Sequence, residues 1–270
     1  MEVSSIKSPT PVVTSVFCRS FTETERQHLY KVSRLFVTFY YLYVSYYGLF
    51  VLDLENIVHP KFGKLGSNWW WKCMSVWSLV IQIAYFFYCT ICIDYAEYIF
   101  GKSRIIMHLE KNKKVRDFYF VSFVFPVTIY VCLFFWTICA VNKPLLFPKE
   151  MSQWIPDWYN HAVHTNPIVL SLLEMITTKR KVPKFSKSLI SLCSLGGSYI
   201  LCLIYVKYTS GFWTYLLIGE IFQSGITEII VFFLFTAFII PCIHLVIGYK
   251  LCSWLWSENT TEEKQRLKDC

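Results

Sequence analysis

Long uncharged stretches dominate the pattern of hydrophobic and polar positions in this chain. Five of them reach the length of about 18 residues that marks a candidate membrane-spanning helix, and they cover residues 35–52, 73–93, 118–141, 188–206 and 229–249. A weaker stretch, 158–173, carries His161 and His164 but no acid, Lys or Arg, and it ends at Glu174. Lipid offers the backbone no hydrogen-bond partner, so such stretches must form helices. The pattern predicts an all-α fold: a polytopic membrane protein built as a six-helix transmembrane bundle.

The positions of Lys and Arg test this arrangement independently. If the N-terminus is cytosolic, the segments on the cytosolic side hold twenty of these residues and the opposite side holds five. Such an excess is typical of cytosolic loops. The bias predicts cytosolic N- and C-termini, and it favours the weaker fourth stretch as a span because an odd number would break the alternation. The predicted parts are a polar, flexible N-terminal tail (1–29), a six-span membrane domain (30–256) and a cytosolic C-terminal tail (257–270).

Composition agrees with a membrane protein and argues against other classes. Hydrophobic residues form 55% of the chain and charged residues only 16%, which is atypical of a soluble domain. The net charge of +8 follows from the basic loops, which contain no recognition element for nucleic acid, so we expect no nucleic-acid partner. Most of the eleven cysteines lie inside apolar stretches, where they are expected to pack as thiols. We expect no metal and no cofactor, and a location in the endoplasmic reticulum or the plasma membrane.

Polar side chains inside predicted spans are functional candidates because burying them in lipid is costly. Two groups stand at the outer ends of spans: Lys72, Ser75 and Gln82 in the second, and Asn160, His161 and His164 in the fourth. Ser75 and His164 each follow a Trp by six residues, which places both about 9 Å below the outer edge at ~1.5 Å per residue. A hydroxyl and an imidazole at matching depth can form a nucleophile and its general base.

Structural explanations of the same residues stay open at this point. A Ser in a spanning helix often bonds the carbonyl one turn earlier. Two histidines without a third ligand do not make a zinc site. Lys72, at a helix end, can extend its amine to the interface with no role in binding. Spacing alone does not decide between packing and catalysis.

One run of residues resembles a family signature. The segment 155–165 matches the pattern Ile-Pro-x-Trp-x-Asn-His-x-x-His-Thr of the family that includes the androgen-induced gene product and the androgen-dependent TFPI-regulating protein. Further matches follow the order of the chain: Trp71-Lys72-x-x-Ser75 with Leu79 and Gln82, Arg116-Asp117, Phe135-Trp136, Glu174, Tyr199 and Gly211-x-Trp213-x-Tyr215. The resemblance covers roughly residues 35 to 256.

The resemblance implies a six-span hydrolase of fatty acid esters of hydroxy fatty acids. Members of this family use a threonine nucleophile and a histidine without a recognised third triad member, and these positions fall on Ser75 and His164. Serine in place of threonine keeps the reactive hydroxyl. A second departure is Leu216, where the family often has proline. Lys72, Asn160, His161 and Trp213 are the candidates for substrate binding.

The predicted function is therefore a membrane-embedded carboxylic ester hydrolase that cleaves lipid esters from the bilayer. His164 would remove the Ser75 proton, Asn160 is the nearest candidate for an oxyanion donor, and Lys72 would hold the free carboxylate of the substrate. The alternative is a non-enzymatic membrane regulator or interaction protein that retains the family fold. A small transporter is less favoured, because the chain shows neither internal repeats nor paired charges inside its spans.

Overall fold

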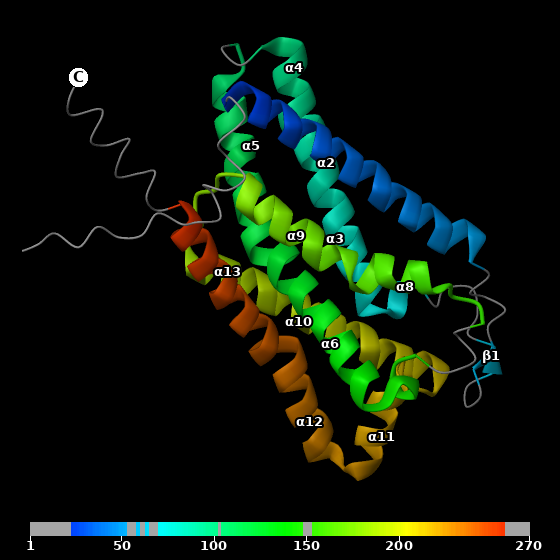
Figure 1. Cartoon of the computed structure of the whole chain (residues 1–270). Coiled ribbons are helices and arrows are strands. Elements are labelled where there is room, and N and C mark those ends of the chain that lie inside the picture. The colour runs from blue at the N-terminus through cyan, green and yellow to red at the C-terminus, as the bar shows by residue number, and fades with distance from the viewer. Residues whose placement is uncertain are drawn as a thin grey trace, which may run out of the picture.

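The computed structural model is a bundle of long helices that run between two ends (Figure 1). It describes residues 23–52, 58–59, 63–64, 70–101, 104–147 and 153–256. The first part of the chain forms α2 (Glu23–Tyr46), η1 (Tyr47–Val51), β1 (Val58–His59), β2 (Gly63–Lys64), η3 (Trp70–Lys72), α3 (Met74–Tyr88), η4 (Cys89–Tyr95), α4 (Ala96–Phe100), α5 (Ile106–Tyr119), η5 (Phe120–Val124), α6 (Phe125–Asn142) and η6 (Lys143–Leu145). The second part forms α8 (Asp157–His164), α9 (Asn166–Thr177), α10 (Phe185–Ser210), α11 (Leu216–Ser224), α12 (Ile226–Leu234), η7 (Phe235–Ile239) and α13 (Ile240–Trp256).

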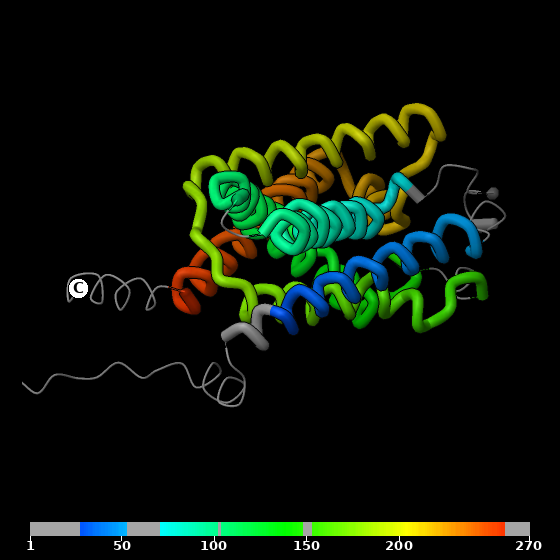
Figure 2. Tube along the Cα trace, turned by 90° about the horizontal axis from the view of Figure 1, so that it is seen from above, coloured from blue at the N-terminus to red at the C-terminus, as the bar shows by residue number. Residues whose placement is uncertain are grey.

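The connections between the helices gather at two opposite ends of the bundle. The start of α2, the turn between α4 and α5, the loop between α9 and α10 and the end of α13 lie at one end (Figures 1 and 2). The start of α3, the start of α8, the end of α10 and the short antiparallel pair β1–β2 lie at the other. In Figure 2, α3 lies between α2 and α10. The connections therefore separate into the same two sets as the predicted cytosolic and outer loops.

Four helical runs are long and apolar enough to cross a membrane. They are Met74–Phe100, Ile106–Leu145, Phe185–Ser210 and Ile226–Trp256, and they contain most or all of the second, third, fifth and sixth predicted spans. The other two predicted spans fall on α2–η1 and α8–α9, which do not reach the same length and apolarity in the described part of the chain. The all-α class and the multi-pass membrane character are confirmed, while the count of six stays a prediction.

Prolines explain several irregular positions in these helices. Pro167 stands at the start of α9, where its missing N–H interrupts the helical hydrogen bonds and separates α8 from α9. Pro126 and Pro241 each follow a wide π-helical turn, η5 and η7 respectively. Such turns rearrange the backbone hydrogen bonds that a proline would otherwise leave open.

The interior is held by close packing and by hydrogen bonds, because apolar side chains gain little from leaving lipid for protein. Tyr41 on α2 is fully buried and donates its hydroxyl proton to the side-chain oxygen of Gln82 on α3. Gly248 on α13 leaves room for Phe125, since a Cβ there would lie 2.7 Å from the Phe125 ring. Gln82, which the sequence groups with Ser75, thus joins α3 to α2 through a hydrogen bond.

A buried ionic cluster joins the helices at the end that holds the α9–α10 loop. The Glu174 carboxylate accepts hydrogen bonds from Tyr85 and Arg180, both at 2.7 Å. Arg180 also lies against the Phe120 ring, 3.6 Å from its centre. Asp117 accepts from Arg116 at 2.6 Å and from a backbone N–H of the loop at 2.9 Å. These contacts fix the loop onto α3 and α5.

Two parts of the prediction lie partly outside the described residues or differ from the structure. Most of the predicted N-terminal tail (1–22 of 1–29) and the whole C-terminal tail (257–270) are outside the described residues, and α2 begins at Glu23 within the predicted tail. The outer connection before the last span contains a helix, α11, that the sequence analysis did not predict. Gly211 ends α10 and Gly225 ends α11, and their positive φ angles of 78° and 151° suit glycine.

Candidate active site

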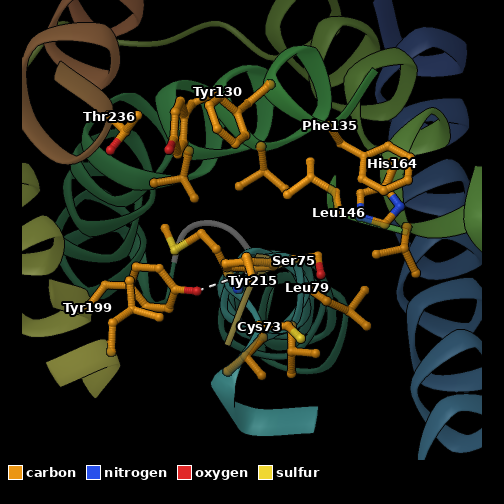
Figure 3. A pocket seen from close by; sticks show the side chains of 18 of the residues that line it. Cys73, Ser75, Leu79, Tyr130, Phe135, Leu146, His164, Tyr199, Tyr215 and Thr236 are labelled. Carbon is orange, nitrogen blue, oxygen red and sulfur yellow. Dashed lines mark hydrogen bonds between the residues drawn. The ribbon is translucent and has the colours of Figure 1, made fainter. Parts of the chain in front are cut away.

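An apolar cavity of about 420 Å³ lies between α3, α6, α8, α10 and η7. Its size falls within the range of about 300–1,000 Å³ that is typical of small-molecule sites. No Asp, Glu, Lys or Arg lines it among the described residues. Polar side chains line it at a few points, namely Ser45, Ser75, Tyr130, Tyr159, Asn160, His164, Tyr199, Tyr215 and Thr236. Figure 3 labels Ser75, Tyr130, His164, Tyr199, Tyr215 and Thr236 among them. The cavity therefore suits an uncharged, largely apolar ligand.

Ser75 is the second residue of α3, and contacts from α10 and from Tyr215, directly before α11, fix the start of that helix. The Met74 N–H donates to the Tyr215 hydroxyl at 2.9 Å. The Tyr199 hydroxyl donates to the Lys72 carbonyl at 3.0 Å and lies 3.2 Å from the Tyr215 hydroxyl, the pair joined by the dashed line in Figure 3. Lys72 and Met74, which carry these bonds just before Ser75, cannot move without breaking them.

His164 is the last residue of α8, and three neighbours hold it. Its Nδ1 lies 2.9 Å from the side-chain oxygen of Asn160. The Phe135 ring stacks on the imidazole at 3.7 Å with an interplanar angle of 10°. The Trp136 indole donates to the His164 carbonyl oxygen at 3.0 Å, which satisfies a carbonyl that the break before α9 leaves free. The ring, its Nδ1 and its backbone are therefore all restrained.

Ser75 and His164 line the same cavity from two different helices (Figure 3). No hydrogen bond joins the Ser75 hydroxyl to the imidazole among the described side chains. Catalytic hydrogen bonds often tighten only when substrate is bound. A hydroxyl and a neutral imidazole that face one cavity have the chemistry of a nucleophile and its general base.

The sequence model of the FAR-17a/AIG1-like proteins matches residues 33–253. The chain belongs to this family. The human androgen-induced gene 1 protein is 29% identical over 225 residues, which cover 82% of this chain and 92% of the relative. The human androgen-dependent TFPI-regulating protein is 27% identical over 227 residues, 84% of this chain and 93% of the relative. The protein of the same name from Mesocricetus auratus is 29% identical over 220 residues, 80% and 88% of the two chains.

No solved structure matches the chain. The family resemblance that was drawn from the motifs is confirmed.

The candidates for substrate binding in this FAR-17a/AIG1-like protein separate into two groups. Asn160 is buried and lines the cavity beside His164. Lys72, His161 and Trp213 lie outside the lining. His161 is exposed, stacks on the Trp136 indole at 5.2 Å and contacts the Thr165 hydroxyl at 2.9 Å through Nδ1.

Trp213 is buried among Phe222, Phe233 and the Lys207 amine, which lies 5.9 Å from its ring. Lys72 ends η3, directly before the cavity-lining Cys73. Its side chain is partly exposed. Only Asn160, of the four candidates, therefore contacts the cavity directly.

Four residues of the site had no role assigned from the sequence, although they stand in the family motifs. Phe135 and Trp136 hold His164, and Tyr199 and Tyr215 hold the start of α3. An aromatic residue in an apolar helix gives no signal that it contacts a catalytic group. The signal for Asn160 was its spacing of four residues from His164 on one helix, which brings the two side chains together.

Proposed function

We propose that this FAR-17a/AIG1-like protein is a membrane-embedded hydrolase of lipid esters, acting on fatty acid esters of hydroxy fatty acids. The observation that carries the proposal is the placement of Ser75 and His164 around one apolar cavity. The family motifs that were matched on these residues support the same chemistry. The role of each residue follows from elementary acid–base properties.

In the proposed reaction, Nε2 of His164 accepts the proton of the Ser75 hydroxyl while Oγ attacks the ester carbonyl carbon. The tetrahedral intermediate collapses, His164 returns the proton to the leaving alkoxide, and the hydroxy fatty acid departs. Ser75 then carries the acyl group. Water, deprotonated by the same imidazole, attacks the acyl carbonyl and releases the fatty acid with Ser75 restored.

The start of α3 supplies a favourable field for the developing oxyanion. Ser75 lies in the first helical turn, where backbone N–H groups have no partner one turn earlier. The Met74 N–H is used by Tyr215, and those of Val76 and Trp77 point to the Cys73 carbonyl at 3.1 and 3.4 Å. We assign the Ser75 N–H, with the positive end of the helix dipole, as the oxyanion donor.

The cavity also limits the substrate class. Because no charged side chain lines it among the described residues, the part of the substrate that enters must be uncharged. A lipid ester meets this condition at its acyl chains and at the ester itself. The free carboxylate of the substrate would stay at the outer interface, where Lys72 is partly exposed near the start of α3.

The proposal includes the topology. We propose that α2–η1 and α8–α9 also cross the bilayer, which makes six spans with both termini in the cytosol. The excess of Lys and Arg in the loops at one end supports this orientation. It places Ser75 and His164 near the outer surface, where water for the second step is close.

Labelling with a fluorophosphonate tests the reaction directly. The purified protein should be labelled and should release fatty acid from a palmitate ester of hydroxystearic acid, whereas Ser75→Ala should lose both signals. Ser75→Thr keeps a hydroxyl and should keep measurable turnover, and His164→Ala should lose turnover while it still inserts into membranes. A native protein that shows neither labelling nor turnover would instead be a non-enzymatic member of the family.

A further inference from the structure

The contact between Asn160 and His164 has a direction that determines where the imidazole carries its proton. Nδ1 of His164 lies 2.9 Å from the side-chain oxygen of Asn160 and 3.2 Å from its backbone oxygen. A backbone carbonyl can only accept a hydrogen bond. Nδ1 must therefore be the donor, and the amide must present its oxygen to the ring. In a neutral imidazole this leaves the lone pair on Nε2.

The surroundings keep this arrangement in place. Asn160 is only 7% exposed, so its amide has little access to competing water. The Phe135 ring lies flat against the imidazole and opposes any tilt away from Asn160. Trp136 holds the carbonyl of His164 itself. The hydrogen bond, the stacked ring and the backbone contact all favour one orientation of the imidazole.

The charges around the ring are few. The ionisable groups that line the cavity among the described residues are His164 itself, Cys73 on the α3 side, Tyr130 from α6, Tyr159 from α8, and Tyr199 and Tyr215 from the α10–α11 side. His161 lies on the exposed side of α8. No carboxylate faces the ring among these groups, so the acceptors that orient it are the side-chain oxygen of Asn160 at 2.9 Å and, at the longer distance of 3.2 Å, its backbone oxygen.

We propose that Asn160 is a positioning residue that completes the Ser75–His164 pair by holding the imidazole with its proton on Nδ1 and its lone pair toward the cavity. The inference rests on the proposed function and adds a third member to the pair. When Nε2 takes the Ser75 proton, the ring becomes an imidazolium and Nδ1–H still donates to the amide oxygen. No proton moves to Asn160, which orients the base without carrying charge.

Substitution of Asn160 separates positioning from mere packing. Asn160→Ala should lower kcat on the order of 100-fold with little change in KM, because the base loses its orientation and not its substrate. Asn160→Asp keeps the volume and places a carboxylate against the ring. It should retain more activity than Asn160→Ala, and the acidic limb of its pH–rate profile should move to higher pH because the carboxylate stabilises the imidazolium. The matched control is Asn166→Ala, since Asn166 contacts Tyr40 at 2.7 Å outside the cavity, and it should leave kcat unchanged.

A measurement that needs no turnover keeps this inference separate from the proposed function. In protein labelled with ¹⁵N-histidine, the His164 signal, assigned by its loss in His164→Gln, should show a protonated Nδ1 in the native chain. In Asn160→Ala only the backbone carbonyl at 3.2 Å remains as an acceptor for Nδ1–H, so the fraction of the Nδ1-protonated tautomer should fall. The same tautomer in both proteins, or an Asn160→Asp profile that matches the native one, overturns the role of Asn160. If the native protein shows no turnover that depends on Ser75, only the proposed function is overturned.

Discussion

Replacing Tyr215 with Phe removes a single oxygen atom that contacts the start of α3. That oxygen accepts from the Met74 N–H at 2.9 Å and lies 3.2 Å from the Tyr199 hydroxyl. At about 0.5–1.5 kcal/mol for each hydrogen bond, the loss should lower the free energy of unfolding by about 1–3 kcal/mol. The first turn of α3, which carries Ser75, would then be free to shift. A displacement of about 1 Å at a reacting group can lower the rate about 100-fold.

The matched control for this change is Tyr249→Phe. The Tyr249 hydroxyl lies 3.1 Å from the Pro183 carbonyl oxygen and 2.7 Å from the Ser188 hydroxyl, near the start of α10. It too is partly exposed and makes two contacts, but these contacts are with the α9–α10 loop and the start of α10. That loop lies at the end of the bundle opposite the start of α3 (Figure 1). Tyr249→Phe should therefore cost a similar free energy of unfolding and leave turnover intact.

Two measurements on each variant decide the outcome. Unfolding in mixed SDS and detergent micelles, followed by circular dichroism, gives the change in stability, and hydrolysis of the palmitate ester gives kcat. Both variants should lose stability, and Tyr215→Phe alone should lose kcat. If Tyr215→Phe loses as much stability as Tyr249→Phe but keeps the native kcat, Tyr215 supports the fold and does not position Ser75.

Three further predictions follow from other parts of the molecule. Glu174→Gln should lower the free energy of unfolding by about 3 kcal/mol, because it removes the carboxylate nearest to the buried Arg180 and leaves only Asp117, at 3.9 Å. Glu110→Gln, on the exposed face of α5, should cause no measurable change in the same SDS titration. Lys72→Met should weaken hydrolysis of the free acid about 10-fold more than that of its methyl ester, if the amine holds the substrate carboxylate through a partly screened contact; equal losses on the two substrates would show that the lysine only reaches the interface. Asn259, in the sequon Asn259-Thr-Thr, should carry no glycan in cells, and a glycan sensitive to endoglycosidase at this position would reverse the proposed orientation.

The helical class and four membrane-crossing helices could be predicted from the sequence because both depend on the length of uncharged stretches. The break within the fourth predicted span was not foreseen, although its signal was present. Pro167 stands three residues after His164, and a proline inside a helical pattern ends the hydrogen-bond ladder there. Helix α11 was missed for a different reason: its nine residues are too short for a periodic pattern to exceed chance.

The residues that surround the site show a sharper limit. Matching depth placed Ser75 and His164 on the same level, and the structure brings both to one cavity. Depth cannot show which face of a helix turns toward a neighbour, so the separation of His161 from His164 could not be predicted. His161 and His164 stand three residues apart, yet one contacts Trp136 at the surface and the other lines the cavity.

The proposed nucleophile and base both stand at helix ends, and this explains why the supporting residues come from elsewhere in the chain. Ser75 is in the first turn of α3 and His164 in the last turn of α8. At such positions backbone groups lack partners within their own helix. Lipid cannot supply those partners, so other side chains must, and here Tyr215 and Trp136 do so. The hydrogen bonds that the membrane makes obligatory thereby also restrain the backbone at both proposed reacting residues. In this proposal a small bundle holds its catalytic pair without a dedicated loop.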